Sequence, residues 1–211
     1  MTKVKVCGIT RKEDLHAAVE EGVDALGFVV GVPASPRNLD VSTAKQLISM
    51  VPIFVTSVLV TLSKSQQSLA ELCKSLQPDA VQFHGETTVS EATLRDATLN
   101  ADLIRAISVD YFSYQNQSET IAGYDAVLGD SAFGNKEGGT GRVHDWTLSR
   151  RIREELKVPF ILAGGLNPDN VATAIFAVEP YAVDVSTGVE SSPGRKDRAK
   201  MSRFIRNAKE A

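Results

Sequence analysis

Eight short runs of β-branched or apolar residues recur along the 211 residues of the chain, and helical patterns separate them. The runs begin near Lys3, Ala25, Ile53, Ala80, Asp102, Asp125, Pro159 and Ala182, at intervals of 22 to 34 residues. Strands this apolar are typical of a parallel sheet covered by helices. Eight strand–helix units predict an α/β fold in which residues 1–211 form a single-domain (β/α)8 TIM barrel.

An open doubly wound sheet is the alternative architecture for alternating strands and helices. It would carry a glycine-rich fingerprint directly after the first strand, where this chain has only Cys7-Gly8. We therefore favour the closed barrel, in which the loops that follow the strands build the active face.

Short cap patterns predict where several helices begin and end. Thr10 followed by Glu13 matches a capping box, and Gly22 predicts the end of that helix. Asn167 and Pro168 predict a cap and a first-turn proline for a later helix.

Composition and charge exclude several classes of partner. A net charge of −3 gives no electrostatic reason to expect nucleic acid or an anionic membrane, although a local site can still bind a small anion. Two cysteines, Cys7 and Cys73, do not make a disulfide framework in a chain of this size. The N-terminus lacks the apolar core of a signal peptide, so we expect a cytoplasmic protein with free thiols.

Cys7 ends the first strand, where a tight turn leads into a helix. A lone cysteine at a strand end is more often a small buried hydrophobe than a reactive group, and Cys73 on an apolar helix stripe fits that description. Cys7 differs because the end of its strand faces the predicted active face. A free thiol has a pKa of roughly 8.5, so a thiol base needs a lowered pKa or an acidified substrate proton.

Asp130 follows the apolar run 126–129 on the sixth strand. The simplest interpretation is a cap for the next loop or helix. A half-buried carboxylate in such a place can instead have its pKa raised enough to act as a general acid. Cys7 and Asp130 lie on strands one and six, so a barrel places them on opposite sides of its mouth. An acid and a base facing a sugar in this way would suit a proton-transfer isomerisation.

Glycine clusters follow the sixth, seventh and eighth strands. They are Gly138 to Gly141, Gly164 with Gly165, and the stretch Ser186 to Gly188. Any one of them could be only a tight turn. Three clusters on one rim favour a phosphate site, because backbone N–H groups can then surround an oxyanion and barrels often bind phosphate after strands seven and eight.

Two further polar side chains follow strands on the same rim. Arg37 comes after Ser-Pro, where a guanidinium could bind a substrate carboxylate in two-point fashion, although a solvated surface arginine is an equal alternative. His84 could be a supporting hydrogen-bond donor. His16, His84 and His144 are dispersed and lack ligand-type partners at suitable spacing, so the sequence predicts no metal site.

Taken in order, six motifs resemble the phosphoribosylanthranilate isomerase family. They are KVCGIT, SPR, VQFHG, an aspartate followed by GGTGR, LAGGLNPDNV and DVSTGVESSPGRKD, and they extend from Lys3 to Asp197. The resemblance implies a ribulose-phosphate-binding type of barrel in tryptophan biosynthesis. Its reaction is the Amadori rearrangement of N-(5-phosphoribosyl)anthranilate to 1-(2-carboxyphenylamino)-1-deoxyribulose 5-phosphate, an aldose–ketose isomerisation by an intramolecular oxidoreductase.

The resemblance also implies roles for individual residues. Cys7 would be the general base at ribose C2, Asp130 the general acid at the ring oxygen, and Arg37 the partner of the anthranilate carboxylate. The phosphate would be held by the glycine loops, at Gly141, Gly164, Gly165, Ser186 and Gly188. The family needs no metal or organic cofactor, and we expect a monomer or homodimer with a small phosphosugar substrate.

Two other functions compete with this one. An isomerase of the imidazole pathway resembles it in reaction but uses two aspartates, and Cys7 in the first strand argues against it. A barrel that only binds a phosphorylated ligand would need neither Cys7 nor Asp130.

Overall fold

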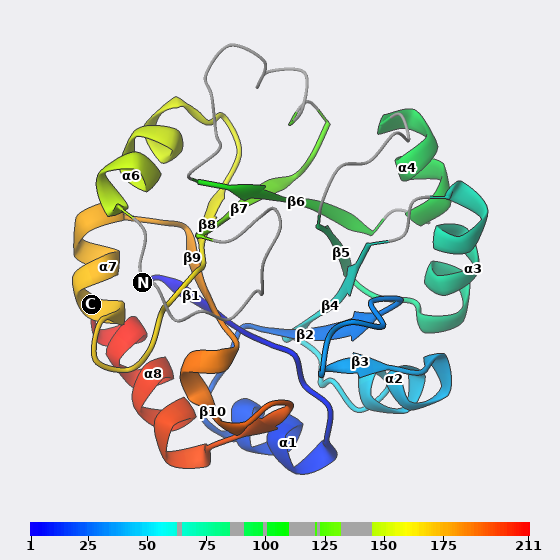
Figure 1. Ribbon diagram of the computed structural model, residues 1–211, viewed down its shortest axis with the longest axis horizontal. Helices are drawn as coiled ribbons and strands as arrows, with labels where there is room; N and C mark the ends of the chain where they lie inside the picture. The colour runs from blue at the N-terminus through cyan, green and yellow to red at the C-terminus, as the bar shows by residue number, and fades with distance from the viewer. Residues whose placement is uncertain (63–64, 85–90, 99–100, 110–120, 122, 132–144) are drawn as a thin grey trace.

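The computed structural model describes residues 1–62, 65–84, 91–98, 101–109, 121, 123–131 and 145–211. Within these residues, eight parallel strands form a closed barrel, because β1 pairs with both β2 and β9 (Figure 1). The barrel strands are β1 Lys3–Cys7, β2 Ala25–Val30, β4 Thr56–Thr61, β5 Ala80–Phe83, β6 Asp102–Ser108, β7 Ala126–Asp130, β8 Phe160–Leu162 and β9 Ala182–Val185. The predicted (β/α)8 barrel is confirmed.

Helices surround the barrel strands (Figure 1). The described α-helices are α1 Lys12–Glu20, α2 Val41–Ile48, α3 Gln66–Leu76, α4 Glu91–Thr98, α6 Trp146–Glu155, α7 Val171–Val178 and α8 Arg198–Glu210. The predicted apolar stripe of α8 is buried, at Met201, Phe204, Ile205 and Ala208.

The barrel strands divide their side chains between two cores. One buried cluster takes alternate residues of the strands, among them Val58 and Val60 on β4 and Ile104 and Ala106 on β6, and fills the barrel interior. The other cluster joins the remaining strand residues to the helices. This alternation follows from the period of two along a strand, and it places Cys7 in the interior cluster.

A short helical turn and a hairpin follow the last barrel strand. The 3₁₀ helix η2 spans Thr187–Val189, and the antiparallel strands β10 Glu190–Ser192 and β11 Arg195–Lys196 come after it. A separate two-residue strand, β3 Asn38–Leu39, pairs with β2. The sequence did not predict these additions to the barrel. The hairpin lies beside the residues that follow β1 and β2, because Thr10 and Arg37 both bond to it.

Three predicted boundaries differ from the structure. Helix α1 has Arg11 at its N-cap, because the Thr10 hydroxyl donates instead to the carbonyl of Gly194. Helix α7 begins after Asn170, and the Asn167 side chain accepts backbone N–H bonds within the turn before it. Strand β4 begins at Thr56 rather than near Ile53, which is exposed in the preceding turn.

Among the described helices, none combines the length and apolar character that crossing a membrane requires.

Candidate active site

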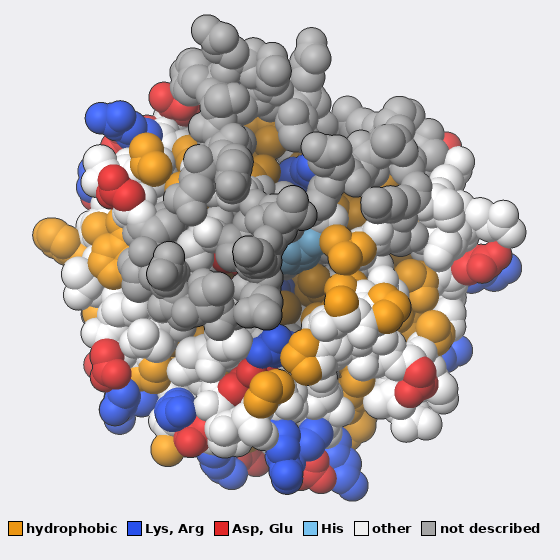
Figure 2. All heavy atoms as spheres, viewed as in Figure 1, with side chains coloured by type: hydrophobic (Ala, Val, Ile, Leu, Met, Phe, Trp, Pro, Cys, Tyr) orange, Lys and Arg blue, Asp and Glu red, His pale blue; other side chains and the backbone are white. Residues whose placement is uncertain are grey.

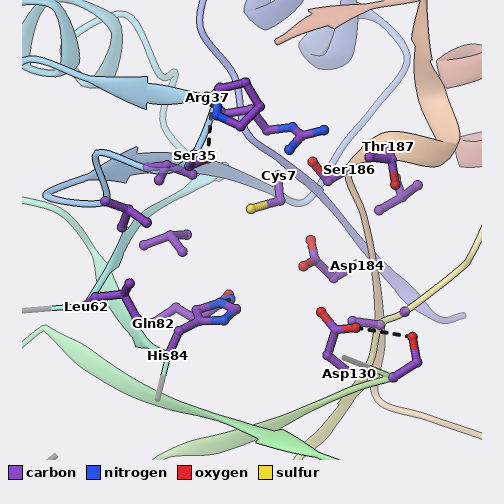
Figure 3. Close-up of a pocket in the computed structure, with 18 of the residues that line it drawn as sticks. Cys7, Ser35, Arg37, Leu62, Gln82, His84, Asp130, Asp184, Ser186 and Thr187 are labelled. Carbon is purple, nitrogen blue, oxygen red and sulfur yellow. Dashed lines mark hydrogen bonds between the residues drawn. The ribbon is translucent and has the colours of Figure 1, made fainter. Parts of the chain in front are cut away.

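A cavity of about 670 Å³ opens at the carboxyl ends of the barrel strands. Its walls come from the ends of β1, β2, β4, β5, β7, β8 and β9 and from the residues that follow them (Figure 3). Hydrophobic side chains gather beside a histidine near the centre of the same face (Figure 2). The cavity brings together most of the predicted site residues, namely Cys7, Arg37, His84, Asp130, Gly164, Gly165 and Ser186.

Cys7 ends β1 on the interior face of the barrel and lines the cavity. Its partner in strand register is Gly27 on β2. A Cβ atom on Gly27 would lie 2.8 Å from the Cys7 sulfur and 3.1 Å from the Cys7 Cα, so only glycine leaves room for this thiol. Burial raises the pKa of the Cys7 thiol, and the nearby positive charge of Lys5 only partly offsets this.

Asp130 ends β7, so β8 and β9 separate it from Cys7 around the barrel. Both residues line the same cavity, as predicted (Figure 3). The Ser131 hydroxyl donates to Asp130 Oδ1 over 3.5 Å. Gly164 packs against this pair, because a Cβ there would lie 2.9 Å from Asp130 Oδ1 and 2.5 Å from the backbone nitrogen of Ser131.

Arg37 lines the cavity from the loop between β2 and β3, and its guanidinium is already paired. Its Nε and Nη2 donate to the two carboxylate oxygens of Glu190 over 2.8 and 2.6 Å. Hydrogen bonding to Glu190 raises the pKa of Arg37, so the side chain remains a cation. A guanidinium has five N–H donors, so the end formed by Nη1 and the second Nη2 hydrogen is left for a ligand.

His84 follows β5 and forms a pair with Gln82 at the cavity wall. The amide nitrogen of Gln82 lies 2.5 Å from Nε2 of His84 and can only donate, so this ring nitrogen accepts. Burial, helped by the charges of Lys5 and Arg105, lowers the pKa of His84 to about 3, so the ring is neutral at physiological pH. In its pair with Gln82, Nε2 of His84 is therefore an acceptor and not the predicted donor.

The predicted phosphate-binding residues occupy different places. Gly164, Gly165 and Ser186 line the cavity. Gly188 lies in η2 against the carbonyl of Leu166, where a Cβ would collide with the backbone, so it allows two loops to approach each other. Gly141 lies outside the described residues.

No group of three or more His, Cys, Asp or Glu side chains in the described part of the chain is arranged to hold a metal ion.

The chain as a whole matches one known family. Residues 4–207 match the family model for N-(5'-phosphoribosyl)anthranilate isomerase. The chain belongs to this family. The N-(5'-phosphoribosyl)anthranilate isomerase of Natronomonas pharaonis is 44% identical over 207 residues, which cover 97% of each chain.

Two solved phosphoribosylanthranilate isomerases share the fold over 100% of both chains. One, in complex with reduced 1-(o-carboxyphenylamino)-1-deoxyribulose 5-phosphate, has a TM-score of 0.81 and is 34% identical. The other, mutually generated monomers of the dimeric enzyme from Thermotoga maritima, has a TM-score of 0.80 and is 33% identical. The predicted isomerase function in tryptophan biosynthesis is thereby confirmed.

Two charged residues beside the candidate site of this phosphoribosylanthranilate isomerase were missed by the sequence analysis. Glu190 binds Arg37 and also accepts from the buried Nζ of Lys196 over 3.0 Å. Burial works to raise the pKa of Glu190, but its hydrogen bonds with these two cations hold the pKa below its ordinary value. Both residues lie in the motif DVSTGVESSPGRKD. The only signal in the sequence was an acidic and a basic residue six positions apart, shortly before the last helix.

Lys196 links the end of β1, which carries Cys7, to Glu190. Its Nζ donates to the carbonyl of Cys7 over 2.6 Å and to that of Ser186 over 3.2 Å, so it links the ends of β1 and β9. Burial lowers the pKa of Lys196, and Glu190 counteracts the shift. Lys196 therefore acts on the backbone of Cys7 and helps to fix where its thiol points.

Proposed function

We propose that Cys7 and Asp130 are the base and the acid of the Amadori rearrangement of N-(5-phosphoribosyl)anthranilate. Asp130 protonates the ribose ring oxygen as its bond to C1 breaks, which opens the furanose and leaves an iminium at C1. Cys7 then removes the proton from C2, and the resulting enolamine tautomerises to the 2-ketose. The observation that carries this proposal is that both side chains line one cavity from β1 and β7.

The order of the two proton transfers explains why a weak base can be sufficient for the second one. Burial raises the pKa of Cys7, so the free thiol is mainly protonated at neutral pH. A C2–H bond beside a cationic C=N is much more acidic than the same bond in the sugar. Ring opening by Asp130 therefore comes first, and a small thiolate population is enough for the second step.

The remaining predicted residues would bind the two ends of the substrate. Arg37 lines a cavity that also has apolar walls, and the N–H donors that Glu190 does not occupy could bind a benzoate carboxylate. At the other end, we assign the phosphate to the loops that carry Gly164, Gly165, Ser186 and Gly188, together with Gly141. His84 forms part of the cavity wall after β5, where it bonds to Gln82.

We infer a cytoplasmic enzyme that works as a monomer or homodimer without a metal or organic cofactor. Two free cysteines suit a reducing compartment. The acid and base assigned here need no further group to complete the proton transfers.

The test is turnover of phosphoribosylanthranilate, followed by the loss of its fluorescence. We expect Cys7→Ala and Asp130→Ala each to lower kcat at least about a hundredfold. Cys73→Ala is the matched control, because it removes the other buried thiol, on α3 and outside the cavity lining. Turnover near the wild-type rate in either active-site variant contradicts the assigned roles, and the substrate of the imidazole pathway, run in parallel, tests the competing isomerase.

A further inference from the structure

Lys5 lies inside the barrel directly below Cys7. The two residues are two positions apart on β1, so their side chains share the interior face. The Lys5 side chain is only 4% exposed, and its Nζ lies 3.0 Å from Oδ1 of Asp184, whose side chain is 10% exposed. A buried lysine and aspartate joined in this way form an ion pair in the floor of the cavity, where Asp184 is part of the lining.

The Cys7 thiol and the Lys5 ammonium both lie next to Gly27 of β2, which has no side chain. A Cβ on Gly27 would lie 2.8 Å from Sγ of Cys7 and 3.2 Å from Nζ of Lys5. Both groups therefore flank the same point, with no side chain of β2 between them. Asp184 is the register partner of Lys5 on β9, so it holds the ammonium from the other side.

We propose that Lys5 is the positioning residue that stabilises the thiolate of Cys7, and that Asp184 holds the Lys5 ammonium beneath the sulfur. Asp184 and Lys5 thus form the electrostatic support of the base. This inference rests on the proposed role of Cys7.

The other charged groups around the thiol are less suited to this task. Arg37 and Lys196 are both held by Glu190, and Lys196 donates to the carbonyl of Cys7 rather than to its sulfur. The charge of Lys5 lowers the pKa of Cys7 more than the charge of Lys196 does. The carboxylate of Asp184 raises it.

Asp130 and His84 complete the charged and titratable groups among the described cavity residues. Asp130 is on β7, with β9 and β8 between it and the strand of Cys7, and the low pKa of His84 keeps its ring neutral. Burial works to lower the pKa of Lys5, but Asp184 and Cys7 outweigh it and raise the pKa, so the ammonium stays charged at neutral pH.

The experiment is a titration of the thiol itself, independent of turnover. In a Cys73→Ala background Cys7 is the only thiol of the chain, so thiolate absorbance near 240 nm against pH reports its ionisation. We expect Lys5→Met to move the midpoint upward by at least about one pH unit and to slow alkylation by iodoacetamide about tenfold at pH 7.5. Lys3→Met is the matched control, because Lys3 lies on the same strand but is exposed and pairs with Asp24.

The double variant Lys5→Met with Asp184→Asn separates loss of the cation from exposure of an unpaired buried carboxylate. It removes both charges, so it also remains testable if the single variant does not fold. We expect its midpoint to stay above that of the wild type. A midpoint equal to the wild type in the double variant, or an equal shift in Lys3→Met, overturns the proposal.

The thiol titration, taken together with the turnover of Cys7→Ala, distinguishes failure of this inference from failure of the proposed function. If Cys7→Ala retains turnover while Lys5→Met still shifts the titration, Cys7 is not the base but Lys5 does stabilise its thiolate. If Cys7→Ala is inactive and the titration does not move, the base is correctly assigned and Lys5 has only a structural role.

Discussion

Arg37 and Glu190 form a two-point ion pair at the mouth of the barrel, with N–O distances of 2.8 and 2.6 Å. The residues are 153 positions apart, and the pair joins the loop after β2 to the hairpin after β9. It holds the guanidinium in one orientation before any ligand arrives. The side chain that is assigned to the substrate carboxylate is thus already ordered, which lowers the entropic cost of binding.

Glu190→Gln should therefore weaken substrate binding more than it slows chemistry. The variant keeps the shape of the side chain but loses the charge that holds Arg37. We expect KM to rise about tenfold, which is about 1.4 kcal/mol, with a smaller change in kcat. Steady-state kinetics measure both. Glu20→Gln is the control, because Glu20 pairs with Arg198 on the surface; an equal KM change in both variants would show that the effect is not local.

Gly164→Ala should damage catalysis through Asp130. Gly164 has a φ of 85°, and its added Cβ would press on Asp130 Oδ1 and on the backbone of Ser131. Moving this proposed acid by a fraction of an ångström is expected to lower kcat/KM about 10- to 100-fold.

Gly22→Ala controls for the backbone strain of that substitution. Gly22 has a φ of 81°, but a Cβ there would meet only Nζ of Lys209 at 3.9 Å. Both variants should lose thermal stability, and only Gly164→Ala should lose activity. Parallel losses of activity would show that strain alone is responsible.

The barrel and the chemical groups at its strand ends could be predicted because they depend on local pattern. Apolar runs at regular intervals require strands, and a polar residue at the end of such a run, such as Cys7 or Asp130, must face the rim. The pairing of Lys5 with Asp184 could not be foreseen, because the two residues are 179 positions apart and meet only when β1 closes against β9.

Local signals failed where a distant contact outweighed them. Thr10 has the right residue type for an N-cap, yet its hydroxyl bonds to the hairpin that carries Gly194. The sequence around Glu190 gives no local signal of its pairing with Arg37, which lies in another loop. Strands of two or three residues, such as β10 and β11, are too short to show a period of two.

His84 should make stability depend on pH in the acidic range. Its pKa is about 3 in the folded protein and about 6.5 in an unfolded chain. The unfolded state therefore binds a proton first, and the contribution of His84 is fully present above pH 6.5 and is lost as pH falls towards 3. Between pH 7.5 and 5 this loss should be about 2 kcal/mol.

Urea unfolding at the two pH values measures this effect when wild type is compared with His84→Gln. The difference between the two proteins cancels the titration of other groups, and the glutamine side chain is long enough to place an acceptor near the position of Nε2, where Gln82 bonds. A double difference close to zero would mean that His84 ionises normally in the folded protein.

Gln77→Gly should stabilise the protein. Gln77 caps α3 in the left-handed region, with a φ of 49°, a conformation that glycine adopts without the strain of a Cβ. We expect the free energy of unfolding to rise by about 0.5–1 kcal/mol, measured by urea denaturation. Glu179 caps α7 with a nearly identical φ of 51°, but its carboxylate also pairs with Arg150 and Arg153. Glu179→Gly should consequently gain less than Gln77→Gly, and a larger gain at Glu179 would show that relief of backbone strain is not the main effect.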